Sequence, residues 1–197
     1  MKRIVLIALV GISLAGNAQT HDGGYPITPV PFTSVKVTDC FWGQRLKASR
    51  EVTIPLAFSK CEETGRYENF VKAAHPSSEY KVEGYSFDDT DVYKTIEGAS
   101  YSMQTYPDKR LGRYVDSILT IVASAQEEDG YLYTARTMNP QHPHEWAGSK
   151  RWEKVEDLSH EFYNLGHMKV LSLTTRRRGK EHFWILRFGM PTVWKRR

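Results

Sequence analysis

The sequence predicts an all-α protein, and two observations carry the prediction. Apolar residues recur three and four positions apart over residues 92–103 and again over 111–125, which is the spacing of amphipathic helices. Only a short link around Pro107 and Asp108 separates the two runs. The two helices are therefore expected to pack antiparallel as a helical hairpin.

The N-terminus has the pattern of a secretory signal peptide. Lys2 and Arg3 precede an apolar run over residues 4–15, and residues 16–18 offer the small side chains that a signal peptidase requires. The run is too short and wrongly flanked for a membrane-spanning helix. We predict a signal peptide over residues 1–18, a periplasmic or secreted protein, and no membrane anchor after cleavage. A buried N-terminal strand or helix is the alternative.

Residues 19–35 are expected to form an extended connector, because they are rich in Gly and Pro. The end of this connector, residues 31–37, is predicted to form a short edge strand. Cys40 and Cys61 are too few for a disulfide framework. Two unpaired thiols, or a single structural disulfide between them, are therefore favoured over a redox role.

A helical body is predicted to follow the connector. Residues 41–54 place Trp42 and Leu46 on one side, and this helix is expected to end near Pro55, whose ring disfavours helix at the preceding residue. Residues 62–84 have weaker periodicity and are predicted to be a loop with a short helical piece.

The hairpin has the clearest start and stop signals. Asp88, Asp89 and Asp91 supply capping side chains and favourable negative charge at the start of its first helix. That helix is predicted to stop before Pro107. The second helix is predicted to begin next and to end at residues 129–130, an Asp-Gly turn.

A long irregular stretch, residues 134–152, follows the hairpin. Loops of this length in compact domains are commonly functional, and Trp146 and Trp152 indicate an ordered loop that lines a site. His142 and His144 in the same loop are candidate metal ligands, although a His pair beside proline is more commonly a surface feature.

A third helix is predicted to start near Asp157 or Ser159. It carries His160, Asn164 and His167 on one face. This polar stripe could hold a metal or a sugar, or could cap and pack in a helical bundle. A zinc-protease helix is disfavoured, because its motif needs a second histidine where this chain has Asn164.

Three longer motifs occur in a fixed order along the chain. They are Phe-Asp-Asp-Thr-Asp-Val-Tyr-Lys at 87–94, Asp-Gly-Tyr-Leu at 129–132, and Ser-His-Glu-Phe-Tyr at 159–163 with Gly-His-Met at 166–168. Together they resemble the N-terminal region of the β-L-arabinofuranosidases of glycoside hydrolase family 127 (GH127). The resemblance covers roughly residues 32–168.

This resemblance implies an (α/α)6 barrel, a ring of helical hairpins, with residues 36–168 as the N-terminal portion of a catalytic domain. It also implies the release of terminal β-L-arabinofuranose from plant-type glycans. His160 matches a family histidine that contacts the sugar, and a neutral imidazole can donate to one hydroxyl and accept from another. Trp146 and Trp152 are candidates for stacking on the sugar ring, with loop packing as the alternative.

The family's catalytic centre has no counterpart that we can assign in this chain. Members of the family use a cysteine nucleophile on a zinc ion held by cysteines and a glutamate, and a separate glutamate as acid/base. The resemblance places these residues beyond position 197. Cys40 and Cys61 match none of them, and nothing marks Glu161 as catalytic. We expect no cofactor in this chain, zinc only in a full-length family member, and no hydrolysis by this fragment.

The charge of the chain changes abruptly after Met168. The last 29 residues hold nine of the 27 Lys and Arg but only one of the 23 acidic residues, so the net charge is −4 before position 169 and +8 from there on. We interpret residues 169–197 as a basic tail that is read out of frame, because plausible codons shifted by one frame restore a family-like helix. Sequencing the locus to its next in-frame stop tests this hypothesis.

Two other functions stay open. The basic tail could make the chain an exported module that binds carbohydrate or a polyanion, and such binding would weaken steeply with salt. Nucleic acid is not expected as the partner of an exported protein. The second alternative is a small scaffold protein without a ligand, which would tolerate substitution of His160.

Overall fold

The computed structural model of the chain describes residues 27–177, with side chains up to position 171. The predicted signal peptide (1–18), most of the connector and the end of the basic tail lie outside the described residues. The chain divides after Val35 into two units, and each is described by itself. Within the described part, no helix is long and apolar enough to cross a membrane.

The first unit contains one regular element, the 3₁₀ helix η1 (Phe32–Ser34). The N–H of Ser34 donates to the carbonyl of Pro31, and that of Val35 donates to Phe32. These bonds close a local turn, so the edge strand expected over residues 31–37 was wrong.

The second unit opens with a long helical segment in three parts. These are α1 (Cys40–Ala48), the π-helical turn η2 (Ser49–Thr53) and α2 (Ile54–Glu63). The Asp39 carboxylate caps α1 by accepting two N–H groups of its first turn. The expected helix end near Pro55 was wrong: Pro55 lies in the first turn of α2, directly after the wider π-turn, where a missing N–H is tolerated.

The expected apolar side of α1 is not buried. Trp42 is 59% exposed and Leu46 is 39% exposed, and α1 buries none of its residues. Periodicity correctly indicated a helix here, but it cannot indicate whether another element covers the apolar face.

A nine-residue helix, α3 (Arg66–Ala74), occupies part of the segment where we expected mainly loop. It starts after Gly65, whose φ of 75° is a left-handed conformation that glycine adopts without strain. The helix buries Phe70 and Ala73 in the core. Residues 75–88 form the loop that leads to the next helix.

The predicted hairpin is confirmed as α4 (Asp89–Thr105) and α5 (Lys109–Ser124). The Asp108 carboxylate caps α5 by accepting from the N–H groups of its first turn. The end of α5 comes earlier than the predicted turn at 129–130. Residues 126–131 instead close a loop, in which the Glu127 N–H donates to the carbonyl of Tyr131 over 2.8 Å.

The stretch 134–152 is largely irregular, as predicted, with two short turns in it: α6 (Thr134–Thr137) and η3 (Glu145–Ala147). The last helix, α7 (Glu161–Arg177), begins close to the predicted start and continues without a break past Met168. Every regular element in residues 27–177 is helical, which confirms the all-α prediction.

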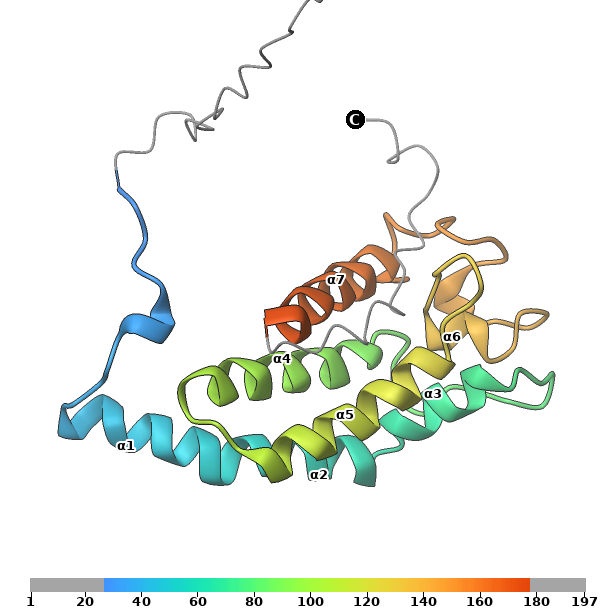
Figure 1. The fold of residues 1–197 in the computed structure, drawn as a ribbon. Coiled ribbons are helices and arrows are strands. Elements are labelled where there is room, and N and C mark those ends of the chain that lie inside the picture. Colours follow the sequence, from blue (N-terminus) through green and yellow to red (C-terminus); the bar gives the residue numbers. More distant parts are fainter. Residues whose placement is uncertain (1–26, 178–197) are drawn as a thin grey trace, which may run out of the picture. The chain divides into compact units, whose positions relative to one another are not determined.

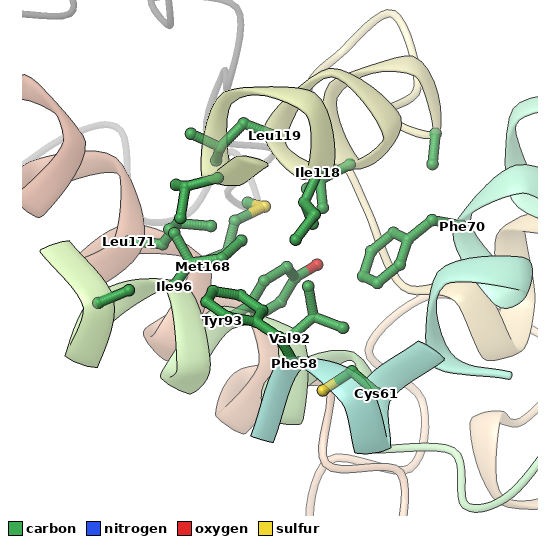
Figure 2. Packing of buried hydrophobic residues seen from close by; sticks show 14 of the residues in the cluster. Phe58, Cys61, Phe70, Val92, Tyr93, Ile96, Ile118, Leu119, Met168 and Leu171 are labelled. Atoms are coloured by element: carbon green, nitrogen blue, oxygen red, sulfur yellow. The ribbon is translucent and has the colours of Figure 1, made fainter. Parts of the chain in front are cut away.

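The core of the second unit forms where α4 packs along α7 and α2, and where α3 packs against α5 (Figure 1). Figure 2 shows Tyr93 and Ile96 of α4 beside Met168 and Leu171 of α7. Leu171 is completely buried. The helix that follows His160 is therefore anchored in the main core by Met168 and Leu171.

Candidate functional site

His160 lies immediately before α7 in a left-handed backbone conformation, with φ of 55°. Its carbonyl accepts from the backbone N–H of Asn164 over 2.9 Å and from the side-chain amide of Asn164 over 3.0 Å. Left-handed conformations of residues other than glycine are costly and are often found at functional sites. The first turn of α7 thus fixes the backbone from which this imidazole projects.

One nitrogen of the His160 ring is already used within the protein. Nδ1 lies 2.7 Å from the carbonyl oxygen of Leu158. A carbonyl can only accept, so Nδ1 carries the proton and Nε2 of the neutral ring is left as an acceptor. The expectation that both nitrogens serve adjacent sugar hydroxyls was wrong, because Nδ1 is occupied by Leu158.

Aromatic rings flank His160 on both sides. The ring of Phe87 lies 4.6 Å from it and that of Tyr163 lies 5.9 Å from it, between centroids. Tyr163 in turn contacts His167 edge-on at 4.7 Å, and its hydroxyl accepts from Lys94 over 3.2 Å. His160 is half-buried, whereas the residues on either side of it, Ser159 and Glu161, are buried.

Trp146 connects to His160 through a stack of rings. Trp146 stacks on Tyr85 at 6.2 Å, and Tyr85 stacks on Phe87 at 5.3 Å with planes 5° apart. We call Trp146, Tyr85 and Phe87 the ring row. Tyr85 is 58% exposed, so the row is open to solvent. Sequence reasoning missed Tyr85, although its position two residues before Phe87 was a usable signal.

Trp152 belongs to a different cluster. It stacks on Phe162 at 5.2 Å and meets Tyr131 edge-on at 5.4 Å. Its φ of 65° is left-handed. The structure therefore brings Trp146 and His160 into one row and places Trp152 in a packing cluster.

Glu161 holds this packing cluster together. The side chain is 2% exposed and accepts from the Trp152 N–H with both carboxylate oxygens, over 3.1 and 3.0 Å. It also accepts from the Tyr131 hydroxyl over 2.6 Å. Burial, together with the nearby carboxylate, raises the pKa of Tyr131. Glu161 therefore links the loop at Trp152 to Tyr131.

The three aspartates at the start of α4 do not cap it with their side chains, which corrects our interpretation. The carboxylate of Asp89 is buried and accepts from the N–H and the hydroxyl of Thr134, over 2.9 and 2.6 Å. Asp88 and Asp91 both pair with Arg66 at 3.2 Å. These bonds join α4 to α3 and to the loop that contains α6.

The described residues hold no group of three or more His, Cys, Asp or Glu side chains that could bind a metal ion. Cys40 and Cys61 are both free, and they lie about 30 Å apart along one helical segment at 1.5 Å per residue. The donor set of a zinc–thiolate centre is thus not assembled in the described part. The cofactor prediction for a full-length family member stays a prediction.

Polar atoms on the inner side of α7 lack partners. Asn164 Oδ1 and His167 Nδ1 are buried and make no hydrogen bond within the described residues. They share a helix face with His160. Buried polar atoms are normally satisfied, so this face has unused capacity for hydrogen bonding.

Comparison with known proteins gives a consistent result. Residues 34–178 match the family model described as β-L-arabinofuranosidase, GH127 catalytic domain. A non-reducing end β-L-arabinofuranosidase of Bifidobacterium longum subsp. longum is 34% identical over 97 residues, which cover 49% of this chain and 14% of the relative. The matched segment continues beyond Met168, as α7 does; the out-of-frame interpretation of the tail stays a prediction.

Two solved structures are similar to the chain. A GH127 β-arabinofuranosidase is 77% identical with a TM-score of 0.80, over 83% of this chain and 26% of that one. A GH127 β-L-arabinofuranosidase from Geobacillus stearothermophilus T6 is 29% identical with a TM-score of 0.67, over 77% of this chain and 24% of that one. These likenesses confirm a partial α/α barrel built from helical hairpins. The chain spans about a quarter of the length of these solved relatives.

Proposed function

Because the chain belongs to the GH127 β-L-arabinofuranosidase catalytic-domain family, we propose that it binds a terminal β-L-arabinofuranose unit of a plant-type glycan beside His160. The observation that supports this most directly is the hydrogen bonding of the two nitrogens of the His160 imidazole. Nδ1 is held by Leu158, which leaves Nε2 as an acceptor next to the exposed ring row.

A furanose fits this arrangement chemically. One sugar hydroxyl donates to Nε2 of His160, and the C–H face of the ring packs against Phe87, which lies 4.6 Å from the imidazole. The contact of Nδ1 with the Leu158 carbonyl positions the imidazole before binding, which reduces the cost of ordering this side chain. Trp146 extends the apolar surface through Tyr85, whereas Trp152 acts by holding the loop rather than by contact with the sugar.

We further propose that this polypeptide by itself does not hydrolyse glycosides. In the family, zinc would lower the pKa of a cysteine thiol and so supply a thiolate nucleophile. Neither Cys40, which is exposed, nor Cys61, which is buried, belongs to a group of metal donors in the described part. Burial also raises the pKa of Cys61, which disfavours its thiolate.

Export to the periplasm or the exterior is part of the same proposal, on the strength of the signal-peptide pattern over residues 1–18. An exported protein would meet plant-type glycans outside the cytoplasm. N-terminal sequencing of the protein recovered from the periplasm or medium would test this, and an intact Met1 would count against it.

The binding proposal is tested by titrating the full chain with methyl β-L-arabinofuranoside and measuring binding by NMR or calorimetry. We expect weak, saturable binding that His160→Ala lowers by roughly fivefold, since a hydrogen bond contributes about 1 kcal/mol. His75→Ala, at an exposed histidine that ends α3, is the matched control and should bind like the parent.

Two results would contradict the proposal. The first is equal binding by the parent and His160→Ala. The second is binding that falls steeply between low and high salt, which would indicate the polyanion-binding alternative. Hydrolysis of the glycoside by the purified chain would separately overturn the proposal that the chain is inactive.

A further inference from the structure

A cavity of about 470 Å³ lies between the loop before α4 and the loop after α6. This volume is within the range of small-molecule sites in proteins. We call it the loop cavity. The lining residues that matter here are Tyr80, Lys81, Val82, His142, His144 and Glu145.

The loop cavity is held open by the buried side chain of Asn139, which is 4% exposed. Its amide donates to the carbonyls of Ser78 and Tyr80 over 3.0 and 3.2 Å. Its side-chain oxygen accepts from the His142 N–H over 3.0 Å. One residue therefore ties the two loops together, and a preformed site loses less entropy when a ligand binds.

The loop cavity adjoins the ring row through His144. The ring of His144 meets Trp146 edge-on at 5.3 Å, and its Nδ1 accepts from the Trp146 N–H over 3.2 Å. The proton of the neutral imidazole must then be on Nε2, which becomes a donor. His144 thus complements His160, whose Nε2 is an acceptor at the other end of the row.

The chemistry of the lining suits a neutral sugar. Val82 and the ring of Tyr80 offer apolar surface for C–H groups, whereas Lys81 and His142 can donate to hydroxyl groups and Glu145 can accept from them. A saccharide presents C–H faces and hydroxyl groups together. The charges of Lys81 and Glu145 offset each other, so the lining favours a neutral ligand over an ion, and a purely apolar ligand would leave the polar side chains unpaired.

We propose that the loop cavity is a second sugar subsite, which binds an internal unit of the same glycan whose terminal arabinofuranose lies at His160. The ring row is the surface along which the intervening units pass. This inference rests on the proposed function for the direction of the glycan, whose terminal unit lies at His160. The cavity and its lining are observed independently of that proposal.

The test compares two probes on the full chain: methyl β-L-arabinofuranoside and an L-arabinofuranose tetrasaccharide. The parent should bind the tetrasaccharide roughly tenfold more tightly, which corresponds to one or two added hydrogen bonds. The double variant Lys81→Ala/His142→Ala should lose this advantage and keep its affinity for the methyl glycoside. The matched control is Lys109→Ala/His75→Ala, at two exposed positions that do not line the cavity.

The outcomes separate the two proposals. An equal affinity of the parent for both probes, or a length advantage that survives in the double variant, overturns the second subsite and leaves binding at His160 intact. Tetrasaccharide binding that depends on Lys81 and His142 but not on His160 supports the subsite while the proposed function fails. Binding of neither probe overturns both.

Discussion

Both carboxylate oxygens of Glu161 accept from one backbone N–H, that of Trp152, at 3.1 and 3.0 Å. Trp152 is in a left-handed conformation, as is His160, the residue directly before Glu161. The carboxylate thus stabilises a strained loop at the point where that loop enters α7. This contact links the position of His160 to the folding of the 148–160 loop.

Substitution Glu161→Gln should therefore destabilise the protein. The amide retains one acceptor oxygen and directs its NH₂ group at donors, so a buried N–H or hydroxyl is left unsatisfied. We expect a loss of about 1–3 kcal/mol in the free energy of unfolding, measured by urea denaturation. Glu156→Gln, at an exposed position of the same loop, is the control. Equal stability of the two variants would contradict the role of Glu161.

The two tryptophans should respond differently to truncation. Trp152→Ala removes the stacking on Phe162 and the edge contact with Tyr131, and should lower the free energy of unfolding by about 2 kcal/mol or more. Trp146→Ala removes a more open contact with Tyr85 and should chiefly weaken glycan binding. The readouts are urea denaturation and tetrasaccharide titration of both variants. The reverse pattern would place Trp152, rather than Trp146, at the sugar.

The buried carboxyl group of Asp89 should make stability depend on pH. Burial raises its pKa to about 7, against the lowering effect of the hydrogen bonds from Thr134. The ordinary value of 3.8 applies to the unfolded chain. The folded state therefore holds the proton more tightly, and this stabilisation is complete below pH 3.8 and is lost as the pH rises to about 7.

Asp89→Asn removes this titration and keeps an acceptor for Thr134. The stability of the parent relative to Asp89→Asn should fall as the pH rises from about 4 to 7, by up to about 1.4 kcal/mol per unit, and then level off. Urea denaturation at four pH values measures the difference. Asp157→Asn, at an exposed carboxylate, should show no such trend. A constant difference between the parent and Asp89→Asn would contradict the assignment.

Helices and motifs were predictable from the sequence, but their surroundings were not. Periodicity located α4 and α5, because each has a continuous apolar stripe that the core buries, whereas the start of α7 was located from the motif that contains His160. In residues 62–84 the weaker periodicity indicated only a short helical piece, which is α3. The role of Pro55 was misjudged, because local rules do not anticipate a π-turn.

In the candidate site too, the sequence identified single residues but not their contacts. His160 and Trp146 were found by residue type and motif, and the structure joins them through Tyr85 and Phe87. Aspartates that resembled helix caps proved to be long-range partners, such as Asp89, which bonds a residue 45 positions away. Sequence spacing could not indicate this, because the choice of partner is made by tertiary packing.

Gly84 and Gly98 should respond in opposite ways to replacement by alanine. Gly84 has a φ of 87°, and a Cβ there would collide with the Asp88 carboxylate. Gly84→Ala should therefore destabilise the protein by more than 1 kcal/mol. Gly98 lies on the exposed side of α4, where a Cβ meets nothing within 4 Å, so Gly98→Ala should stabilise it by about 1 kcal/mol. Thermal denaturation of both variants is the measurement, and a shift in the same direction would contradict the prediction.

Leu171 lies beyond Met168, in the segment that the sequence sets apart by its charge, yet its side chain is completely buried beside the core of α4 (Figure 2). If the segment after Met168 folds as the structure has it, Leu171→Ala removes apolar contacts and leaves a cavity. The free energy of unfolding should then fall by about 2–5 kcal/mol. Lys169→Ala, at an exposed position of the same helix turn, should change it by less than about 0.5 kcal/mol. Equal stability of the two variants in urea denaturation would mean that α7 ends before Leu171 in solution, and that the core closes without it.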